Sequence, residues 1–434
     1  MIAITRRHMS ASAAALLAGC ATQTNTSTAP PTRAPAAIGA WGIDLTSRDT
    51  SVQPGDDFFR YVNGHWLDTT EIPADRVTWG TFSILAEKAE RDVKAIIDEV
   101  SAAGGAPGSN QQKIADFYNS YNDQAAIEAA GMTPTQADLA AIDAMRTHED
   151  VARLIGRPDI ALDFPLAIYI DLDERNPDRF LVQMTHGGLS LPDREYYLSQ
   201  DAAFAEIRQQ FQAHVGRMLT AGGVSGAEVK ARQIFALETE IARHHWPIEQ
   251  RRERERIYNL LNHAQIRALE PRFPWDAWLE SAELGSVQEV NVHELSAMQP
   301  LARTVLSTPV ATWKAYFTYK YLVNYAAVLP RALDDENFDF YSRTLNGQQQ
   351  QRDRWRRAVT ATNGALGKAI GQIYVQRHFS ADAKAQMLAL VENMRRAYGE
   401  RINALTWMSP ETKVAAREKL QTFLPKIGYP DNWR

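Results

Sequence analysis

The chain has 434 residues, with 47 Lys and Arg against 52 Asp and Glu, and its formal net charge is −5. Hydrophobic residues at 45% and charged residues at 23% are globular values, which exclude a collagen-like or wholly disordered chain. The single cysteine excludes an intrachain disulfide and any zinc site built from several thiolates. The acidic balance argues against nucleic acid as a partner. No apolar run reaches 18 residues, so we expect no membrane-spanning helix.

The first twenty residues have the organisation of a secretory signal. Arg6 and Arg7 form a positive segment, an alanine-rich apolar stretch follows, and small residues precede Cys20. Residues 17–20 (LAGC) also resemble a bacterial lipobox, in which the cysteine becomes the lipid-bearing first residue. We therefore predict a lipoprotein signal peptide at 1–19 and attachment to membrane lipid through Cys20. The alternatives are a buried free cysteine and, for the two arginines, either a twin-arginine export signal or ordinary signal-peptide charges.

A tether follows the predicted lipid anchor. Residues 20–40 are rich in Thr, Ser, Pro and Ala and have no apolar period, so we predict a disordered segment. Ala21 stands where an acidic residue usually signals retention in the inner membrane. We therefore expect an exported bacterial lipoprotein in the outer membrane, facing the periplasm or the exterior. The folded region is expected to occupy residues 41–434.

Helical periodicity dominates the folded region. The apolar pattern predicts helices over 83–100 and 110–122, and capping residues predict further helices opening at Thr133, Ser380 and Ser409. The helix that begins at Ser380 carries one apolar stripe, formed by Met387, Val391, Met394, Tyr398, Ile402 and Leu405.

Strand signal is confined to one place. Two short apolar runs, at 164–171 and 179–184, flank a polar stretch at 173–178. They predict a β-hairpin near 164–184 with a longer polar turn. The predicted fold class is therefore mainly α with a small β element.

The sequence shows no complete catalytic or metal-binding set. A zinc protease of the H-E-x-x-H type needs two histidines four residues apart on one helix, with the glutamate between them polarising water. His148-Glu149 and His293-Glu294 each have alanine where the second histidine should stand. We predict that these pairs are surface or capping residues.

Two other polar pairs also favour structural roles. His244 and His245 are neighbours, whose side chains point about 100° apart on a helix, so they are poor joint ligands. We expect both to be half-buried structural residues. Asp56 and Asp57 are predicted to be a solvated loop pair or a helix cap.

Several unusual strings occur in a fixed order along residues 41–434. They include PGDDFFRYVNGHWL at 54–67, WGTF at 79–82, LSLPDREYYL at 189–198, TWKAY at 312–316, LTWM at 405–408 and IGYP at 427–430. This succession resembles the N-terminal region of the neprilysin family of zinc metalloendopeptidases, which includes the endothelin-converting enzymes and the bacterial oligoendopeptidase O.

The resemblance implies a large helical cap lobe. In this family two lobes enclose a cavity, and the cap lobe limits access to short peptides. The zinc ligands and the catalytic glutamate lie in sequence after the IGYP string, and none of them occurs here. Zinc is thus implied for the intact family enzyme and not for this chain. Some members bind substrate through arginines at positions that match Thr78 and Ala86, our substrate-proximal candidates.

Two functions follow from this resemblance. In the first, the chain is the cap region of a peptide-cleaving zinc enzyme and is inactive alone, so its partners are peptides and a missing or separate catalytic domain. In the second, it is a truncated, non-catalytic helical module that binds peptides or a protein partner at the membrane surface. In either case, helices that would pack against the missing lobe are expected to expose apolar surface.

Overall fold

The computed structural model describes residues 44–160 and 162–433. The predicted signal peptide, the tether and Cys20 lie outside these residues. The chain divides into two compact units, Met1–Glu71 and Ile72–Arg434, which are described separately. In the described part of the chain, no helix is long and apolar enough to cross a membrane.

The described part of the first unit is a short helical segment. It contains the 3-10 turn η1 (Leu45–Ser47) and helix α2 (Phe58–Thr69). The carboxylate of Asp57 accepts the backbone N–H of the third helical residue at 2.8 Å, which confirms the predicted helix cap. Gly64 lies against Asp49, because a Cβ atom at Gly64 would stand 2.4 Å from the Cβ atom of Asp49.

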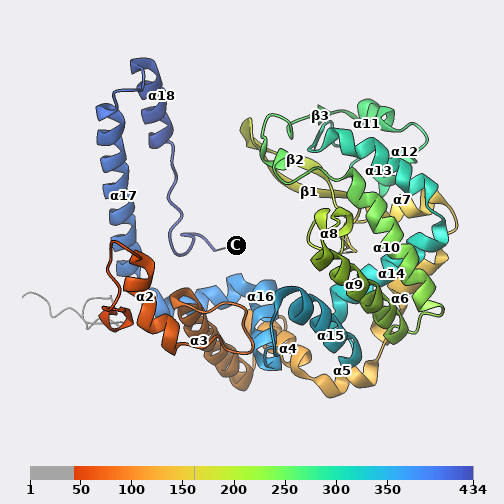
Figure 1. The fold of residues 1–434 in the computed structure, drawn as a ribbon, viewed down its shortest axis with the longest axis horizontal. Coiled ribbons are helices and arrows are strands. Elements are labelled where there is room, and N and C mark those ends of the chain that lie inside the picture. The colour runs from red at the N-terminus through yellow and green to blue at the C-terminus, as the bar shows by residue number, and fades with distance from the viewer. Residues whose placement is uncertain (1–43, 161, 434) are drawn as a thin grey trace, which may run out of the picture. The chain divides into compact units, whose positions relative to one another are not determined.

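The second unit is built mainly from helices (Figure 1). In chain order the α-helices are α3 (Thr81–Ala103), α4 (Asn110–Asn122), α5 (Gln124–Ala130), α6 (Gln136–Ala144), α7 (His148–Gly156), α8 (Glu195–Leu198), α9 (Ala202–Ala221), α10 (Ala227–His244), α11 (His263–Leu269), α12 (Trp275–Ser281), α13 (Leu295–Ser307), α14 (Val310–Tyr325), α15 (Arg331–Asn337), α16 (Arg354–His378), α17 (Ala381–Ala404) and α18 (Pro410–Gln421). Short 3-10 turns are η2 (Thr133–Thr135), η3 (Gln250–Arg252) and η4 (Ala326–Val328), and η5 (Phe338–Thr344) is a π-helical turn.

Most predicted helix boundaries agree with the structure. Helix α4 has the predicted bounds, α3 extends the predicted 83–100 at both ends, and the hydroxyls of Ser380 and Ser409 cap α17 and α18. The prediction at Thr133 is wrong in detail. This residue opens the 3-10 turn η2, and the α-helix begins only at Gln136.

A four-stranded sheet contains the predicted hairpin. Strands β1 (Leu166–Asp173) and β2 (Asn176–His186) are antiparallel, with Leu166 opposite His186. The predicted long turn is wrong, because residues 176–178 belong to β2. Two short strands that the sequence pattern missed complete the order β1-β2-β4-β3, with β4 (Val290–Val292) parallel to β2 and β3 (Leu260–Leu261) antiparallel to β4.

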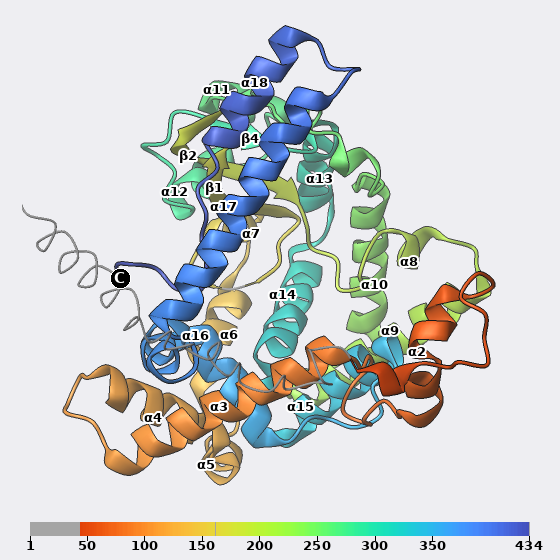
Figure 2. The same ribbon diagram turned by 90° about the vertical axis from the view of Figure 1, so that its left-hand side faces the viewer.

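The second unit has two separate hydrophobic cores. The large core joins α6 to α15 and the sheet, and its fully buried residues include Trp275, Trp278, Trp313, Tyr316 and Tyr319. The small core joins α3, α4 and α16, which lie together in Figure 2, and contains Ile96, Ile97, Ile114, Val359 and Ile370. Together these cores confirm a mainly helical lobe.

Candidate functional site

The two His-Glu pairs found in the sequence occupy different environments. His148 stands at the start of α7, with its Nε2 atom 2.9 Å from the carbonyl of Thr308. Its neighbour Glu149 is exposed and pairs with Arg153 at 3.1 Å. This pair therefore has the predicted surface and helix-terminal position.

Glu294 corrects the prediction for the second pair, because it is buried rather than on the surface. Its carboxylate accepts hydrogen bonds from Thr185 Oγ1 at 2.8 Å and the backbone N–H of His186 at 3.3 Å. Arg251 Nε lies 3.2 Å away and supplies the opposite charge. The parallel pairing of β2 with β4 brings Glu294 to His186, which precedes it by 108 residues.

The carboxylate of Glu294 belongs to a group of side chains that we call the histidine cluster. Its members are His186, His245, Trp246, Arg251 and Glu294. The two imidazole rings are stacked, with centroids 3.8 Å apart and planes 27° from parallel. The backbone N–H of Trp246 donates to His186 Nε2 at 3.2 Å, which places the proton of a neutral ring on Nδ1. That Nδ1 atom is buried and has no hydrogen-bond partner among the described residues.

Both stacked histidines are neutral in the folded protein. Burial, helped by the positive charge of Arg251, lowers the pKa of His186 to about 3. Burial and the neighbouring ring of His186 lower the pKa of His245 to about 3. His244 and His245 are half-buried, as predicted. Every member of the cluster except Glu294 lines a cavity of about 270 Å³, whose wall also includes Arg194 and Asp193. With Arg194, Asp193 and the neutral His186 and His245, the cavity can accommodate a polar group.

A second buried network positions the LSLPDREYYL string. Glu238 of α10 is fully buried, and its carboxylate accepts hydrogen bonds from Ser190 Oγ at 2.6 Å and from the Tyr197 hydroxyl. The same Tyr197 hydroxyl accepts the backbone N–H of Leu191 at 2.9 Å. Burial raises the pKa of Glu238. These hydrogen bonds hold the turn at residues 189–198 in place. Ser190 and Tyr197 therefore have a structural role.

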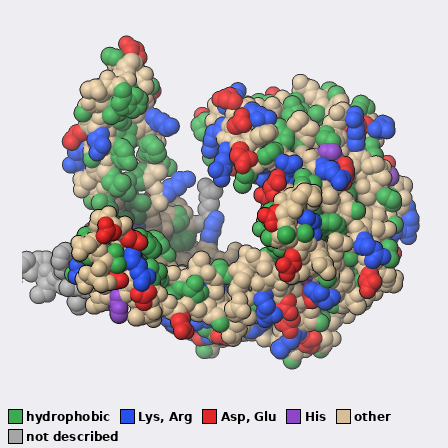
Figure 3. Space-filling view, viewed as in Figure 1, with side chains coloured by type: hydrophobic (Ala, Val, Ile, Leu, Met, Phe, Trp, Pro, Cys, Tyr) green, Lys and Arg blue, Asp and Glu red, His purple; other side chains and the backbone are tan. Residues whose placement is uncertain are grey.

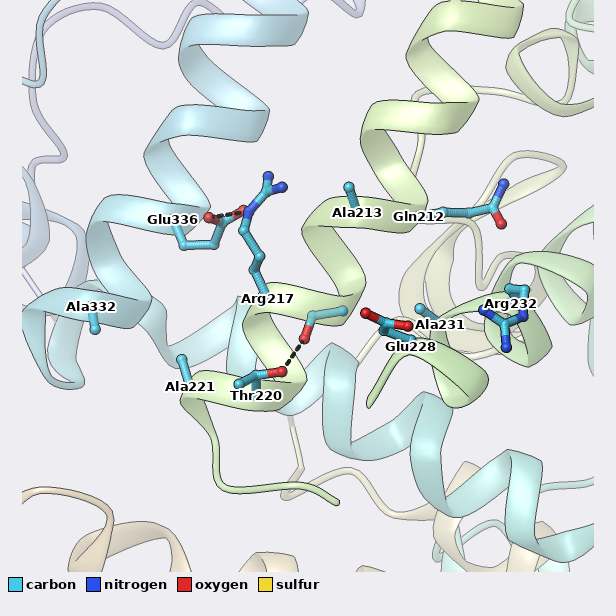
Figure 4. A pocket seen from close by; sticks show the side chains of 11 residues that line it. Gln212, Ala213, Arg217, Thr220, Ala221, Glu228, Ala231, Arg232, Ala332 and Glu336 are labelled. Atoms are coloured by element: carbon cyan, nitrogen blue, oxygen red, sulfur yellow. Dashed lines mark hydrogen bonds and ion pairs between the residues drawn. The ribbon is translucent and has the colours of Figure 1, made fainter. Parts of the chain in front are cut away.

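A pocket of about 700 Å³ lies between α9, α10 and α15 (Figure 4). Arg217 and Glu336 pair across it at 2.6 Å, and Glu336 also lies 2.9 Å from His214 Nδ1. The rest of the lining combines small side chains with Gln212, Thr220, Glu228 and Arg232. The pocket is therefore polar on one side, with one ion pair across it.

The most extensive candidate interaction surface lies on α17 and α18. Both helices are described in full, and all of their residues are at least partly exposed. Figure 3 shows hydrophobic side chains gathered over this hairpin. The exposed apolar surface of α17–α18, as we call it, consists of Met387, Leu388, Leu390, Met394, Tyr398, Trp407, Val414, Phe423 and Leu424.

The C-terminal IGYP string folds back onto the base of this hairpin. Gly428 has a φ of 68°, in the left-handed region, and a Cβ atom there would stand 2.5 Å from the ring of Phe379. Lys384 donates to the carbonyl of Tyr429 at 2.8 Å and pairs with Asp431 at 2.7 Å. The string thus fixes the chain beside α17.

The two substrate-proximal candidates both lie near the start of α3. Thr78 precedes the helix, Ala86 lies within it, and both are exposed. Neither side chain carries charge, and the nearby Arg76 is paired with Glu87 at 3.0 Å. A role for Thr78 and Ala86 in substrate contact stays a prediction.

Among residues 44–160 and 162–433, no three His, Cys, Asp or Glu side chains are grouped so that they could hold a metal ion. A catalytic zinc site takes three protein ligands and leaves one position open for water or substrate. The described residues therefore do not fit a catalytic zinc ion. They provide two buried polar networks, paired charges and an exposed apolar surface.

Solved structures with this fold include a zinc metalloprotease in several states. An inhibitor complex of Mycobacterium tuberculosis zinc metalloprotease Zmp1 matches 91% of this chain and 60% of its own, with 38% identity and a TM-score of 0.85. The open and partially open states of Zmp1, each 37% identical, give TM-scores of 0.73 and 0.70. PepO from Lactobacillus rhamnosis HN001, at 22% identity and a TM-score of 0.76, shares the fold.

Sequence comparison defines the family. Human endothelin-converting enzyme-like 1 is 28% identical over 405 residues, which are 88% of this chain and 51% of that protein. Residues 54–430 match the N-terminal region of peptidase family M13. The chain belongs to peptidase family M13, a family of zinc metallopeptidases. This match confirms the resemblance to the neprilysin and endothelin-converting enzyme family. It spans about half the length of the curated relatives it matches.

Proposed function

We propose that this chain is the cap-forming N-terminal region of an M13 zinc metalloendopeptidase and does not hydrolyse peptides by itself. The observation that carries the proposal is the absence of any three-ligand group among the described residues, in a chain that matches 60% of Zmp1. The zinc of the complete enzyme would then be held by residues outside the described set. When bound, zinc would activate water for attack on the peptide bond.

The exposed apolar surface of α17–α18 supports this proposal. Exposed apolar patches of this extent mark interaction surfaces in soluble proteins. Trp407 and Leu424 are 76% and 77% exposed, and three further side chains on α17 and α18, Met394, Tyr398 and Val414, exceed 50%. We infer that the remaining part of an M13 peptidase covers this surface, which would bury it and join the cap to the catalytic residues.

The large hydrophobic core would contribute shape rather than chemistry. Its tryptophans and tyrosines are packed and its buried carboxylates Glu238 and Glu294 are hydrogen-bonded, so it forms a fixed wall. A fixed wall beside the catalytic residues would restrict the substrate to peptides of limited size.

We also propose that the intact protein is an exported lipoprotein of the outer membrane, attached through Cys20. The support is the order of charged, apolar and small residues before that cysteine. Mass spectrometry of the protein from membranes should find cleavage before Cys20 and an acyl modification on it. An unmodified chain that begins at Met1 would contradict this localisation.

A chimera tests the functional proposal. Residues 41–430 of this chain are joined to the part of Zmp1 that follows the matched region, and hydrolysis of a fluorogenic peptide library is measured with zinc and with chelator. We expect chelator-sensitive hydrolysis by the chimera. The same chimera with Met394→Asp and Leu390→Asp should lose activity, whereas the exposed polar control Glu392→Gln should keep it.

The outcomes of this experiment separate the two functions. If the parent chimera and its Glu392→Gln control both bind zinc but do not hydrolyse the fluorogenic peptides, the proposed cap role is contradicted. A chain that captures peptides with unchanged affinity when α17 carries the two aspartates would instead favour the non-catalytic binding module.

A further inference from the structure

Strand β1 is an edge strand, because the order of the sheet is β1-β2-β4-β3 (Figure 1). The backbone N–H of Gly187 donates to the carbonyl of Pro165 at 3.2 Å, so this opposed pair is a bonded one. Bonded pairs alternate along an antiparallel ladder, which turns the backbone groups of Ile168, Ile170 and Leu172 away from β2. We call these backbone groups the outer edge of β1. Among the described residues, no other element forms backbone hydrogen bonds to them.

An exposed apolar face accompanies the outer edge. Side chains at alternate positions of a strand share one face, so Ile170 and Leu172 lie together, and Phe180 of β2 is opposite Leu172. Their exposed fractions are 71%, 47% and 70%. Three large apolar side chains therefore stand in solvent beside unpaired backbone groups, which is the combination that invites another strand.

The opposite face of β1 borders a polar recess of about 40 Å³. Tyr169, Gln183 and Asn291 lie in register across β1, β2 and β4 and line this recess. The carboxylates of Asp171 and Glu174 also line it, and the described lining contains no Lys or Arg. Burial and the negative charge of Asp171 raise the pKa of Tyr169. The recess therefore has a negative potential and room for one water-sized cationic group.

The carboxylate of Asp171 lies at the outer edge and accepts the backbone N–H of Leu172 at 2.7 Å. It forms no ion pair with another described residue, whereas the nearby Glu174 pairs with Arg254 at 2.6 Å. A carboxylate without a counter-charge attracts a cation from a partner strand. It also opposes pairing with a second copy of the chain, which would bring another Asp171 to the same edge.

The turn end of the hairpin is held in place by a buried carboxylate. Asp173 accepts hydrogen bonds from the backbone N–H of Arg175 at 2.9 Å, from Arg179 Nε at 2.7 Å and from the Tyr258 hydroxyl at 3.0 Å. Native edge strands are commonly protected by Lys or Pro, and residues 166–173 contain neither. The edge is thus both ordered and open, so a partner strand would not have to order it first.

We propose that the outer edge of β1 binds an extended peptide as an additional strand, with apolar side chains against Ile170 and Phe180 and a Lys or Arg side chain in the recess beside Asp171. Main-chain hydrogen bonds supply affinity in this mode, and the alternation of apolar and basic residues supplies selectivity. The binding needs no zinc and does not rest on the proposed cap function.

Fluorescence anisotropy of labelled peptides tests this site on the purified full chain without added zinc. The probe is Thr-Val-Lys-Val-Lys-Val-Thr, and we expect saturable binding. Replacement of both lysines by glutamate should weaken binding about tenfold, because two carboxylates would then meet Asp171. Two further probes carry N-methyl groups on the valines or on the lysines. One of these patterns should abolish binding, because only alternate N–H groups of an added strand face β1.

Substitutions in the chain place the binding at this edge. Asp171→Lys should reverse the selectivity, so that the glutamate probe binds more tightly than the lysine probe. Asp116→Lys makes the same charge change at an exposed position of α4 and should leave the selectivity unchanged. Ile170→Lys should weaken binding of the lysine probe about tenfold, since it removes apolar contact and adds a like charge. Val229→Lys, at an exposed apolar position of α10, is its matched control.

The contrary results are specific. Equal affinity for the lysine and glutamate probes, or binding that survives both N-methyl patterns, would overturn strand addition without any variant. Parent affinity in folded Asp171→Lys and Ile170→Lys would also overturn it. A dimer in analytical ultracentrifugation that Ile170→Lys converts to a monomer would assign the edge to a second copy. Failure of the chimera to hydrolyse peptides would leave these binding results unchanged, so the two proposals are tested separately.

Discussion

The large core and the α17–α18 hairpin both contain helices rich in apolar side chains but have opposite exposure. Helix α14 buries Trp313, Tyr316 and Tyr319 completely, whereas α17 leaves Met394 and Tyr398 more than half exposed. Helix α14 is surrounded by other elements on most sides, whereas no residue of α17 is buried. The difference shows that the burial of an apolar side chain depends on the elements packed around its helix.

The largest expected effect contrasts two tryptophans. Trp313→Ala should lower the free energy of unfolding by about 3–5 kcal/mol, because it removes a fully buried ring and leaves a cavity. Trp407→Ala should change it by less than about 0.5 kcal/mol, because this ring is 76% exposed. Urea unfolding followed by circular dichroism measures both. Equal losses for the two variants would mean that the α17–α18 hairpin and the large core are stabilised alike.

Loss of the buried carboxylate of Glu238 should have the second largest effect on the free energy of unfolding. Glu238→Ala leaves the hydroxyls of Ser190 and Tyr197 without their acceptor and should cost about 2–3 kcal/mol. Glu240→Ala on the same helix removes a half-exposed carboxylate that pairs with Arg243, and should cost less than about 1 kcal/mol. The same urea titration compares them. A neutral result for Glu238→Ala would show that the network does not hold the 189–198 turn.

The stacked histidines predict a pH dependence of stability. Their pKa values are about 3 when folded, against about 6.5 when unfolded, so the unfolded chain binds more protons between these values. The stabilisation is complete above pH 6.5 and falls as pH decreases towards 3, by up to about 1.4 kcal/mol per pH unit for each histidine.

Urea titrations between pH 6.5 and 5 measure this slope before most carboxylates titrate. His245→Gln should reduce the slope by up to about 1.4 kcal/mol per pH unit, whatever its effect at neutral pH. Substitution of the half-buried His148, which lies outside the histidine cluster, serves as the control. A variant slope equal to that of the parent would contradict the neutral state of His245 in the folded protein.

The smallest expected effect on stability concerns α17. Met394→Asp should change the unfolding free energy by less than about 0.5 kcal/mol, because the side chain is 51% exposed. It should nevertheless reduce the fluorescence of a dye that binds apolar surface, relative to Glu392→Gln. Strong destabilisation without loss of dye binding would place Met394 inside a core.

Local sequence signals predicted much of the fold. Serine caps, apolar spacing and the turn composition located α4, α17, α18 and the β1–β2 hairpin, because each signal lies within a few neighbouring residues. Strands β3 and β4 were not predicted from the sequence, because a strand of two or three residues is too short to show an alternating apolar pattern. The π-helical turn at 338–344 and the two-core division also depend on packing between distant segments.

The polar sites were less predictable than the helices. The sequence predicts Glu294 to be a surface or capping residue, because Ala297 stands where a second histidine ligand would be needed, whereas its burial comes from the pairing of β4 with β2. Likewise, Asp334 meets Arg357 only when α15 and α16 are both in place. A sequence lists charges, whereas their pairing is a property of the tertiary fold.

The account rests on the chain being a cap region without its own zinc chemistry. The most direct test is to incubate the purified chain with zinc and a fluorogenic peptide library and to measure hydrolysis with and without chelator. The account predicts no chelator-sensitive hydrolysis by the chain alone, under conditions in which complete Zmp1 cleaves its peptides. Chelator-sensitive hydrolysis that persists through purification and is lost on unfolding the chain would contradict it.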